Sequence, residues 1–190
     1  MTDPAQAAPR TALVVTVSDR AAMGQRGDRS GQLVAERLAG LGFAVERAVV
    51  PDERDEIEGA LRDGAARHGL VLTTGGTGLT PRDVTPQATL AVVDYEVPGL
   101  AEAMRAEGRR QTPLAALSRA VVGVRARSLI VNLPGSPSGA SESLDAIAEV
   151  LPHALETLAG PFDHAAHART AEASAAVQRS GGQGQGRVRP

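Results

Sequence analysis

Short apolar runs rich in β-branched residues alternate along this chain with segments whose apolar residues have helical spacing. Ala12–Val17 reads ALVVTV, almost without polar positions, and this predicts a strand buried on both faces. Farther along, Val34, Leu38 and Leu41 recur at i, i+4 and i+7, which predicts a helix. This alternation favours a three-layer α/β/α fold, in which helices cover both faces of a mostly parallel sheet.

The same alternation continues to about residue 158. The predicted strands cover residues 12–17, 43–50, 70–74, 120–124 and 129–131. The predicted helices cover residues 31–41, 54–67, 98–107 and 113–119, a helix beginning near Pro86, and one long helix from Gly139 to Leu158.

The length and the limits of this pattern predict one domain with two flanking segments. The chain has 190 residues, which suits a single domain. We expect a flexible leader over 1–10, a folded domain over 11–160, and a disordered tail over 161–190, where Ala, Gln, Gly, Ser and Arg predominate.

Charge and hydropathy indicate the surroundings in which the domain works. The formal net charge of −2 disfavours nucleic acid or an anionic membrane as a partner. Residues 1–10 lack the apolar stretch of a signal peptide, and no apolar run is long enough for a membrane-spanning helix. We therefore expect a cytoplasmic protein.

The chain lacks Cys, Lys and Trp, and the absence of the first two excludes whole classes of chemistry. The chain has no Cys, which excludes disulfides, thiolate nucleophiles and Cys-ligated metals. All 20 basic residues are Arg, so a Schiff-base Lys and the Lys of a Walker A loop are also excluded. A protein of this composition that handles phosphates must use backbone N–H groups, Arg side chains or a metal ion.

Polar loops follow four of the predicted strands. Because ligands bind outside the carboxyl ends of strands in open α/β sheets, we expect these loops to form one binding edge. They are Ser18-Asp19-Arg20, Pro51-Asp52-Glu53, Gly75-Gly76-Thr77-Gly78 and Asn132-Leu133-Pro134-Gly135-Ser136.

The glycine loop at 75–78 is suited to an anion, because glycine permits positive φ and successive N–H groups can then converge on one point. The alternative is a tight turn without a ligand. The loop is not G-x-G-x-x-G, which disfavours a dinucleotide fold and a nicotinamide-dependent oxidoreductase.

Asp52 and Asp83 are the candidate catalytic carboxylates. Two carboxylates from different strand ends beside a glycine loop would suit Mg²⁺, which could bridge to phosphate oxygens. The alternatives are a solvated turn for Asp52 and a helix cap for Asp83, with Thr85 equally suited to that cap. Arg20 and Arg82 are candidates for contacts with pyrophosphate.

Two further polar features lie later in the chain. Ser136, Ser138 and Ser141 could supply hydroxyls to a ligand, or one of them could cap the following helix. Both roles can hold together because helix N-termini attract anions. His164 and His167 have H-x-x-H spacing but no third ligand in a clear motif, so a metal site there is disfavoured.

Several of these motifs, in this order, resemble the MogA/MoaB family of molybdenum-cofactor biosynthesis proteins over roughly residues 10–160. The motifs are Ser18-Asp19-Arg20, Asp28-Arg29-Ser30-Gly31, Thr74-Gly75-Gly76-Thr77-Gly78, Arg82-Asp83-Val84-Thr85-Pro86, Pro98-Gly99, Leu117-Ser118-Arg119 and Asn132-Leu133-Pro134-Gly135-Ser136-Pro137. The resemblance implies a MoaB/Mog domain over 11–160 with that family's α/β fold, assembled as a homotrimer or a hexamer.

The resemblance also implies a molybdopterin adenylyltransferase, which joins molybdopterin to AMP from ATP with Mg²⁺ and releases pyrophosphate. A MoeA-like molybdotransferase would accept the product. Asp52 and Asp83 match the two central aspartates of the family. The alternative is a non-catalytic MoaB-like molybdopterin-binding scaffold. The residues implied to line the molybdopterin and nucleotide pocket are Ser18, Asp19, Ser30, Gly75, Gly76, Thr77, Gly78, Asn132, Pro134, Gly135 and Ser136.

Overall fold

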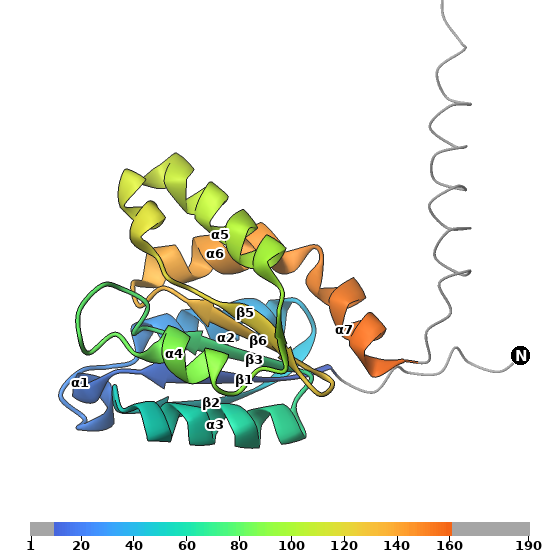
Figure 1. The fold of residues 1–190 in the computed structure, drawn as a ribbon, viewed down its shortest axis with the longest axis horizontal. Helices are drawn as coiled ribbons and strands as arrows, with labels where there is room; N and C mark the ends of the chain where they lie inside the picture. The colour runs from blue at the N-terminus through green and yellow to red at the C-terminus, as the bar shows by residue number, and fades with distance from the viewer. Residues whose placement is uncertain (1–9, 161–190) are drawn as a thin grey trace, which may run out of the picture. The chain divides into compact units, whose positions relative to one another are not determined.

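A computed structural model describes residues 10–160 of the chain (Figure 1). The predicted leader over 1–10 lies outside the described residues except for Arg10, which begins the first strand. The predicted tail, with His164 and His167, also lies outside them. The strands are β1 Arg10–Val17, β2 Phe43–Val50, β3 Leu70–Thr74, β4 Tyr95–Glu96, β5 Val122–Arg125 and β6 Ser128–Leu133. The helices are α1 Asp19–Ala22, α2 Arg29–Gly40, α3 Arg54–Arg67, α4 Thr85–Leu90, α5 Pro98–Gln111, the 3₁₀ helix η1 Pro113–Leu117, α6 Pro137–Ala148 and α7 Leu151–Ala159.

The strands form one sheet in the order β2-β1-β3-β6-β5-β4. The pairings β1–β2, β1–β3 and β3–β6 are parallel, which confirms the predicted mostly parallel sheet. β5 and β4 run antiparallel on the far side of β6. The four parallel strands therefore have their carboxyl ends at one edge, which we call the carboxyl edge.

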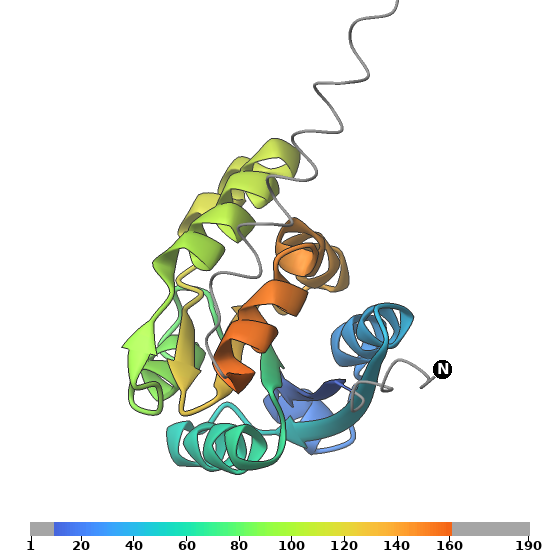
Figure 2. The same ribbon diagram turned by 90° about the vertical axis from the view of Figure 1, so that its right-hand side faces the viewer.

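Helices cover both faces of the sheet, as Figure 2 shows. Alternate strand residues point to opposite faces, so Val14 and Leu72 belong to one buried cluster and Leu13 and Val71 to the other. The first cluster packs against α2, α5, α6 and α7, whereas the second packs against α3 and α4. The three-layer prediction is confirmed.

Two short elements were not predicted, and one predicted helix is wrong. The short helix α1 and the two-residue strand β4 were not predicted, because neither is long enough to show a hydrophobic period. The single helix predicted from Gly139 to Leu158 is wrong, since the chain forms α6 and then α7. Pro152 lies in the first turn of α7, where its missing N–H would interrupt a continuous helix.

Within residues 10–160, none of the helices combines the length and the apolar character needed to cross a bilayer.

Candidate active site

The four predicted polar loops emerge together at the carboxyl edge, and backbone hydrogen bonds join them in pairs. The amide of Ser18, after β1, donates to the carbonyl of Val50 at the end of β2 at 2.9 Å. The amide of Gly75, after β3, donates to the carbonyl of Leu133 at the end of β6 at 3.2 Å. The expectation that these loops share one edge is therefore confirmed for their backbones.

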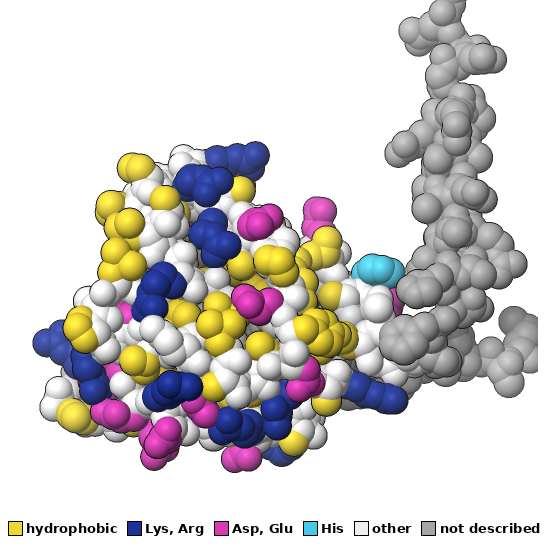
Figure 3. All heavy atoms as spheres, viewed as in Figure 1, with side chains coloured by type: hydrophobic (Ala, Val, Ile, Leu, Met, Phe, Trp, Pro, Cys, Tyr) yellow, Lys and Arg dark blue, Asp and Glu magenta, His cyan; other side chains and the backbone are white. Residues whose placement is uncertain are grey.

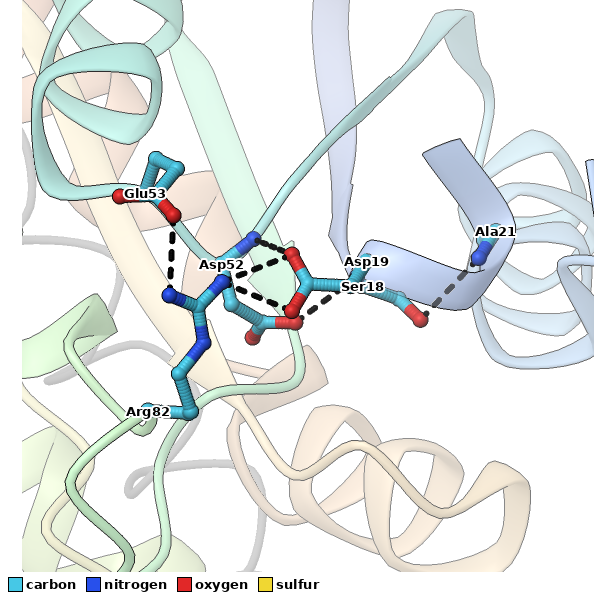
Figure 4. Close-up of polar contacts among 6 residues, drawn as sticks. All are labelled: Ser18, Asp19, Ala21, Asp52, Glu53 and Arg82. Carbon is cyan, nitrogen blue, oxygen red and sulfur yellow. Dashed lines mark hydrogen bonds and ion pairs between the residues drawn. The ribbon is translucent and has the colours of Figure 1, made fainter. Parts of the chain in front are cut away.

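Asp19 and Asp52 bind each other's backbone reciprocally (Figure 4). The Asp19 amide donates to Asp52 Oδ2 at 2.8 Å, and the Asp52 amide donates to Asp19 Oδ1 at 3.0 Å. This exchange fixes the loops after β1 and β2 against one another. Asp52 is half-buried, lies in a bend between β2 and α3, and its carboxylate is bound to the Asp19 amide.

Arg82, from the segment after β3, contacts Asp19 of this pair and also Glu53 (Figure 4). Its Nη2 lies 2.9 Å and 2.7 Å from the two carboxylate oxygens of Asp19, and its Nη1 lies 2.9 Å from Oε1 of Glu53. One exposed guanidinium thus connects the loops after β1 and β2 to the segment that follows the glycine loop. Arg82, proposed from sequence as a pyrophosphate contact, forms ion pairs with carboxylates in this structure.

The two aspartates of the reciprocal pair have opposite pKa shifts. The hydrogen bond from the Asp52 amide and those from Arg82 lower the pKa of Asp19. Burial raises the pKa of Asp52, and the negative charges of Asp19 and Asp83 add to that effect against the opposing Asp19 amide and Arg82.

Asp83 closes the turn that follows the glycine loop. Its Oδ2 accepts a hydrogen bond from the Thr80 amide at 2.8 Å, and its own amide donates to the Thr80 carbonyl at 3.0 Å. Burial acts to raise the pKa of Asp83, but hydrogen bonds from Thr80 and Gly78 and the charge of Arg119 outweigh it and hold the pKa low. Asp83 is therefore ionised at neutral pH.

Neither Asp83 nor Thr85 caps the helix that follows, so the cap considered for them is wrong. Helix α4 has Val84 at its N-cap and no side-chain cap hydrogen bond. The Thr85 hydroxyl instead donates to the carbonyl of Gly75 at 2.9 Å.

The glycines of the loop are required by close backbone approaches. Gly75 has φ +99°, and a Cβ there would lie 2.4 Å from the carbonyl oxygen of Val17. Gly76 has φ +63°, and a Cβ there would lie 2.2 Å from the Thr85 hydroxyl. A Cβ on Gly135 would lie 3.2 Å from the Cα of Gly75, so the two loops touch. Side chains here would push these loops apart.

A polar pocket of about 390 Å³ opens on one side of this glycine contact. The N-termini of α2 and α6, capped by Asp28 and Ser136, both border it. A Cβ on Gly31 would lie 2.2 Å from the Thr16 hydroxyl, which shows how closely the first turn of α2 approaches β1. The pocket is lined by Thr16, Val17, Ser18, Ala21, Arg26, Gly27, Asp28, Arg29, Ser30, Thr74, Gly75, Gly135, Ser136 and Pro137.

A second, apolar pocket of about 370 Å³ lies on the other side, between α5, η1 and α6. Figure 3 shows hydrophobic side chains gathered over η1, where Leu114 and Leu117 are exposed. Ser136 borders both pockets. The apolar pocket is lined by Thr77, Gly78, Met104, Arg105, Gly108, Thr112, Leu114, Ala115, Leu117, Ser118, Ala120, Pro134, Ser136, Gly139, Glu142 and Ser143.

The predicted site residues divide between these pockets, the carboxylate cluster and the interior. Within residues 10–160, the linings of the two pockets contain no side chain from Asp19, Asp52 or Asp83, which lie beside them. Gly76 belongs to neither lining, although both of its neighbours do. The predicted residues in the linings are Ser18, Ser30, Gly75, Thr77, Gly78, Pro134, Gly135 and Ser136.

Asn132 is the predicted site residue that the fold places in the interior. It is fully buried, and its Nδ2 donates to Thr73 Oγ1 at 3.1 Å and to Thr89 Oγ1 at 2.8 Å. Its Oδ1 accepts from the Val121 amide at 3.2 Å. The Asn132 side chain therefore holds β6 to its surroundings and is not presented to a ligand. The loop sequence alone could not distinguish these roles.

Sequence reasoning considered Thr85 only as a helix cap and assigned no role to Arg119, although both residues stand in motifs that carry the resemblance. Both make hydrogen bonds to carbonyls of the glycine loop. The signal was their presence in Asp83-Val84-Thr85-Pro86 and Leu117-Ser118-Arg119, but side-chain-to-carbonyl bonds across the fold leave no spacing rule in a sequence.

Comparisons with known proteins identify the family of this chain. A family model described as a probable molybdopterin binding domain matches residues 13–153. The molybdopterin adenylyltransferase of Haemophilus influenzae is 45% identical over 139 residues, covering 70% of this chain and 71% of that protein. The enzyme of the same name from Escherichia coli K12 is 39% identical, covering 78% and 85%.

A longer relative and a solved structure also come from molybdenum-cofactor biosynthesis. The molybdenum cofactor synthesis protein cinnamon of Drosophila melanogaster is 41% identical over 76% of this chain, which spans only 25% of that protein. The crystal structure of the molybdopterin biosynthesis enzyme MoaB from Thermus thermophilus matches with a TM-score of 0.75 at 52% identity, covering 81% of this chain and 99% of that one. The chain therefore belongs to the molybdopterin-binding family of molybdenum-cofactor biosynthesis proteins that includes MogA and MoaB.

Proposed function

We propose that this protein is a molybdopterin adenylyltransferase, which transfers AMP from ATP to molybdopterin and releases pyrophosphate. The observation that carries the proposal is the placement of Asp52 and Asp83 at the carboxyl edge. They follow separate strands, β2 and β3. The Asp52 carboxylate binds the loop after β1, and Asp83 lies against Gly78 at the end of the glycine loop, whose residues line both pockets. Relatives named molybdopterin adenylyltransferase, 39% to 45% identical, support the same reaction.

The two pockets suit the two kinds of group that such substrates carry. The polar pocket offers hydroxyls from Ser18, Ser30 and Ser136, the guanidinium of Arg26, and two helix N-termini. These groups suit phosphate oxygens, because helix N-termini and Arg attract anions. The apolar pocket suits a flat ring system. Since both pockets border Ser136, one substrate pair can span them.

The reaction needs positioning more than covalent help from the protein. A phosphate oxygen of molybdopterin attacks the α-phosphorus of ATP, a new P–O bond forms, and the bond to the bridging oxygen breaks so that pyrophosphate leaves. Loop amides near Gly76 and Thr77 would hold phosphate oxygens in line for attack. Asp52 and the ionised Asp83 carboxylate would help to orient the reacting groups.

We further propose that Asp52 and Asp83 hold Mg²⁺ together with the phosphates. Residues 10–160 contain no group of three or more His, Cys, Asp or Glu side chains that could hold a metal ion by themselves. A pair of carboxylates fits nonetheless, because Mg²⁺ is commonly bound by one or two carboxylates plus substrate phosphates and water. When bound, the ion would neutralise developing charge on the phosphate oxygens.

The test is pyrophosphate release from ATP, Mg²⁺ and molybdopterin. We expect turnover by the native chain and its loss in Asp83→Asn, while Asp63→Asn, an exposed change on α3, leaves turnover intact. Full activity in Asp83→Asn would refute the role of that carboxylate. Tight molybdopterin binding without nucleotide turnover would favour the non-catalytic scaffold instead.

Three further proposals rest on the family alone. We propose a homotrimer, a MoeA-like molybdotransferase that receives the adenylated product, and a cytoplasmic location. Sedimentation equilibrium tests the first. Transfer of the adenylated product to a purified molybdotransferase tests the second.

A further inference from the structure

Every carbonyl of the glycine loop is held by a residue outside the loop. The carbonyls of Gly75 and Gly76 accept hydrogen bonds from Thr85, through its hydroxyl at 2.9 Å and its amide at 3.2 Å. Thr85 is fully buried, so this half of the loop is anchored in the protein interior.

Arg119 holds the other half of the loop. Its backbone amide donates to the Thr77 carbonyl at 3.1 Å, and its Nε donates to the Gly78 carbonyl at 2.7 Å. Its Nη2 donates to the backbone carbonyl of Asp83. One half-buried side chain therefore joins the end of the glycine loop to the residue that carries the candidate carboxylate.

This anchoring decides where the loop amides point. In a planar trans peptide, the carbonyl of one residue and the N–H of the next point in opposite directions. Carbonyls turned toward Thr85 thus leave the N–H groups of Gly76 and Thr77 facing away from it. The Thr77 carbonyl points toward Arg119, so the N–H of Gly78 faces away from Arg119. This N–H helps to lower the pKa of Asp83.

Arg119 also lies outside the linings of the two pockets. Its neighbours Ser118 and Ala120 line the apolar pocket, but Arg119 does not. Within residues 10–160, the hydrogen bonds of its guanidinium go to the carbonyl oxygens of Gly78 and Asp83. Its positive charge therefore lies beside the glycine loop and helps to hold the pKa of the Asp83 carboxyl low.

We propose that Arg119 is a positioning residue, which fixes the glycine loop and Asp83 for the transfer without touching the substrates. This inference rests on the proposed function. The planar guanidinium is suited to the task, because its fork reaches the Gly78 and Asp83 carbonyls together, which a Lys ammonium cannot do in one fixed geometry.

The test compares Arg119→Gln and Arg119→Lys with a matched control. Arg125 donates in the same way from Nη1 to the Val92 carbonyl at 2.8 Å, but it lies at the opposite edge of the sheet. We expect Arg119→Gln to lower kcat about 100-fold, because small misplacements of reacting groups cost that much. Arg119→Lys should give an intermediate kcat, and Arg125→Gln should match the native chain.

Two readouts separate positioning from general stability. A positioning role predicts that kcat and kcat/KM fall together while KM for ATP changes by less than about threefold. Backbone ¹⁵N order parameters over residues 76–84 should fall from about 0.85 toward 0.6 in Arg119→Gln and stay high in Arg125→Gln.

A folded Arg119→Gln variant with native kcat or a native, rigid loop would overturn the proposal. If that variant does not fold, Arg119→Lys decides, since native kcat and native order parameters there would overturn it equally. If the native chain transfers no AMP, the proposed function fails, and the order parameters still decide whether Arg119 fixes the loop.

Discussion

Replacing Asn132 by alanine removes three hydrogen bonds from one buried place beside the carboxyl edge. Nδ2 no longer donates to the Thr73 and Thr89 hydroxyls, and the Val121 amide loses the Oδ1 acceptor. Asn132, Thr73 and Thr89 are all fully buried, so water does not replace the lost partners without entering the interior.

The orphaned Val121 amide alone should cost about 1–3 kcal/mol, and each of the two lost hydroxyl bonds about 0.5–1.5 kcal/mol. We therefore expect Asn132→Ala to lower the free energy of unfolding by about 4 kcal/mol. For a chain of this length, 1 kcal/mol corresponds to roughly 2–4 °C, so Tm should fall by about 10 °C.

Thermal unfolding followed by circular dichroism measures this fall, and Asn132→Asp is the matched control. The carboxylate can still accept from the Val121 amide and from both hydroxyls, but it buries a charge. Its deficit should shrink as pH falls, because the protonated form is neutral. If the Tm of Asn132→Ala lies within about 3 °C of the native Tm and molybdopterin binding is weakened, Asn132 binds the ligand and our assignment of a structural role is refuted.

Other perturbations test the loops and their charges. In chemical denaturation, Gly75→Ala should lose about 2 kcal/mol or more, because a Cβ would lie 2.4 Å from the Val17 carbonyl at φ +99°. Gly59→Ala, in the open interior of α3, should gain roughly 0.5–1 kcal/mol, and the reverse order would contradict the clash. Burial raises the pKa of Asp52 in the folded protein, so the free energy of unfolding should fall as pH rises from the ordinary Asp pKa through the raised pKa. Asp52→Asn should remove this dependence of stability on pH. The pKa of Asp83 is lowered in the folded protein, so its carboxylate stabilises the fold above the ordinary Asp pKa and loses that effect as pH falls through the lowered pKa. Asp83→Asn should abolish this loss of stability at low pH. The same dependence of stability on pH in Asp52→Asn and Asp83→Asn would contradict the two shifts.

The sequence predicted the parts of this protein that are governed by hydrophobic period. Phe43–Val50, Arg54–Arg67 and Leu70–Thr74 have the predicted bounds, because apolar spacing and the glycines that stop these segments are local signals. The shared edge of the four polar loops followed from parallel pairing, since parallel strands end on one side.

The carboxylate network could not be predicted, because its contacts join residues distant in sequence. Nothing local indicates that Asp19 and Asp52 exchange backbone hydrogen bonds, or that Arg82 pairs with Asp19 across 63 positions. Asn132 was predicted to line the pocket because it begins a polar loop, but its buried side chain instead binds Thr73 on the neighbouring strand. Side-chain direction at the end of a strand decides such cases, and sequence does not report it.

The pairing of β3 with β6 has a consequence for the order of assembly. The Asn132–Thr73 bond spans 59 positions, so β6 joins the sheet only after a long loop has closed, a step whose entropic cost slows folding. Both pockets use residues that follow β6, among them Ser136. A chain in which only β1, β2 and β3 have paired therefore has neither pocket, so ligand binding would report completion of the sheet.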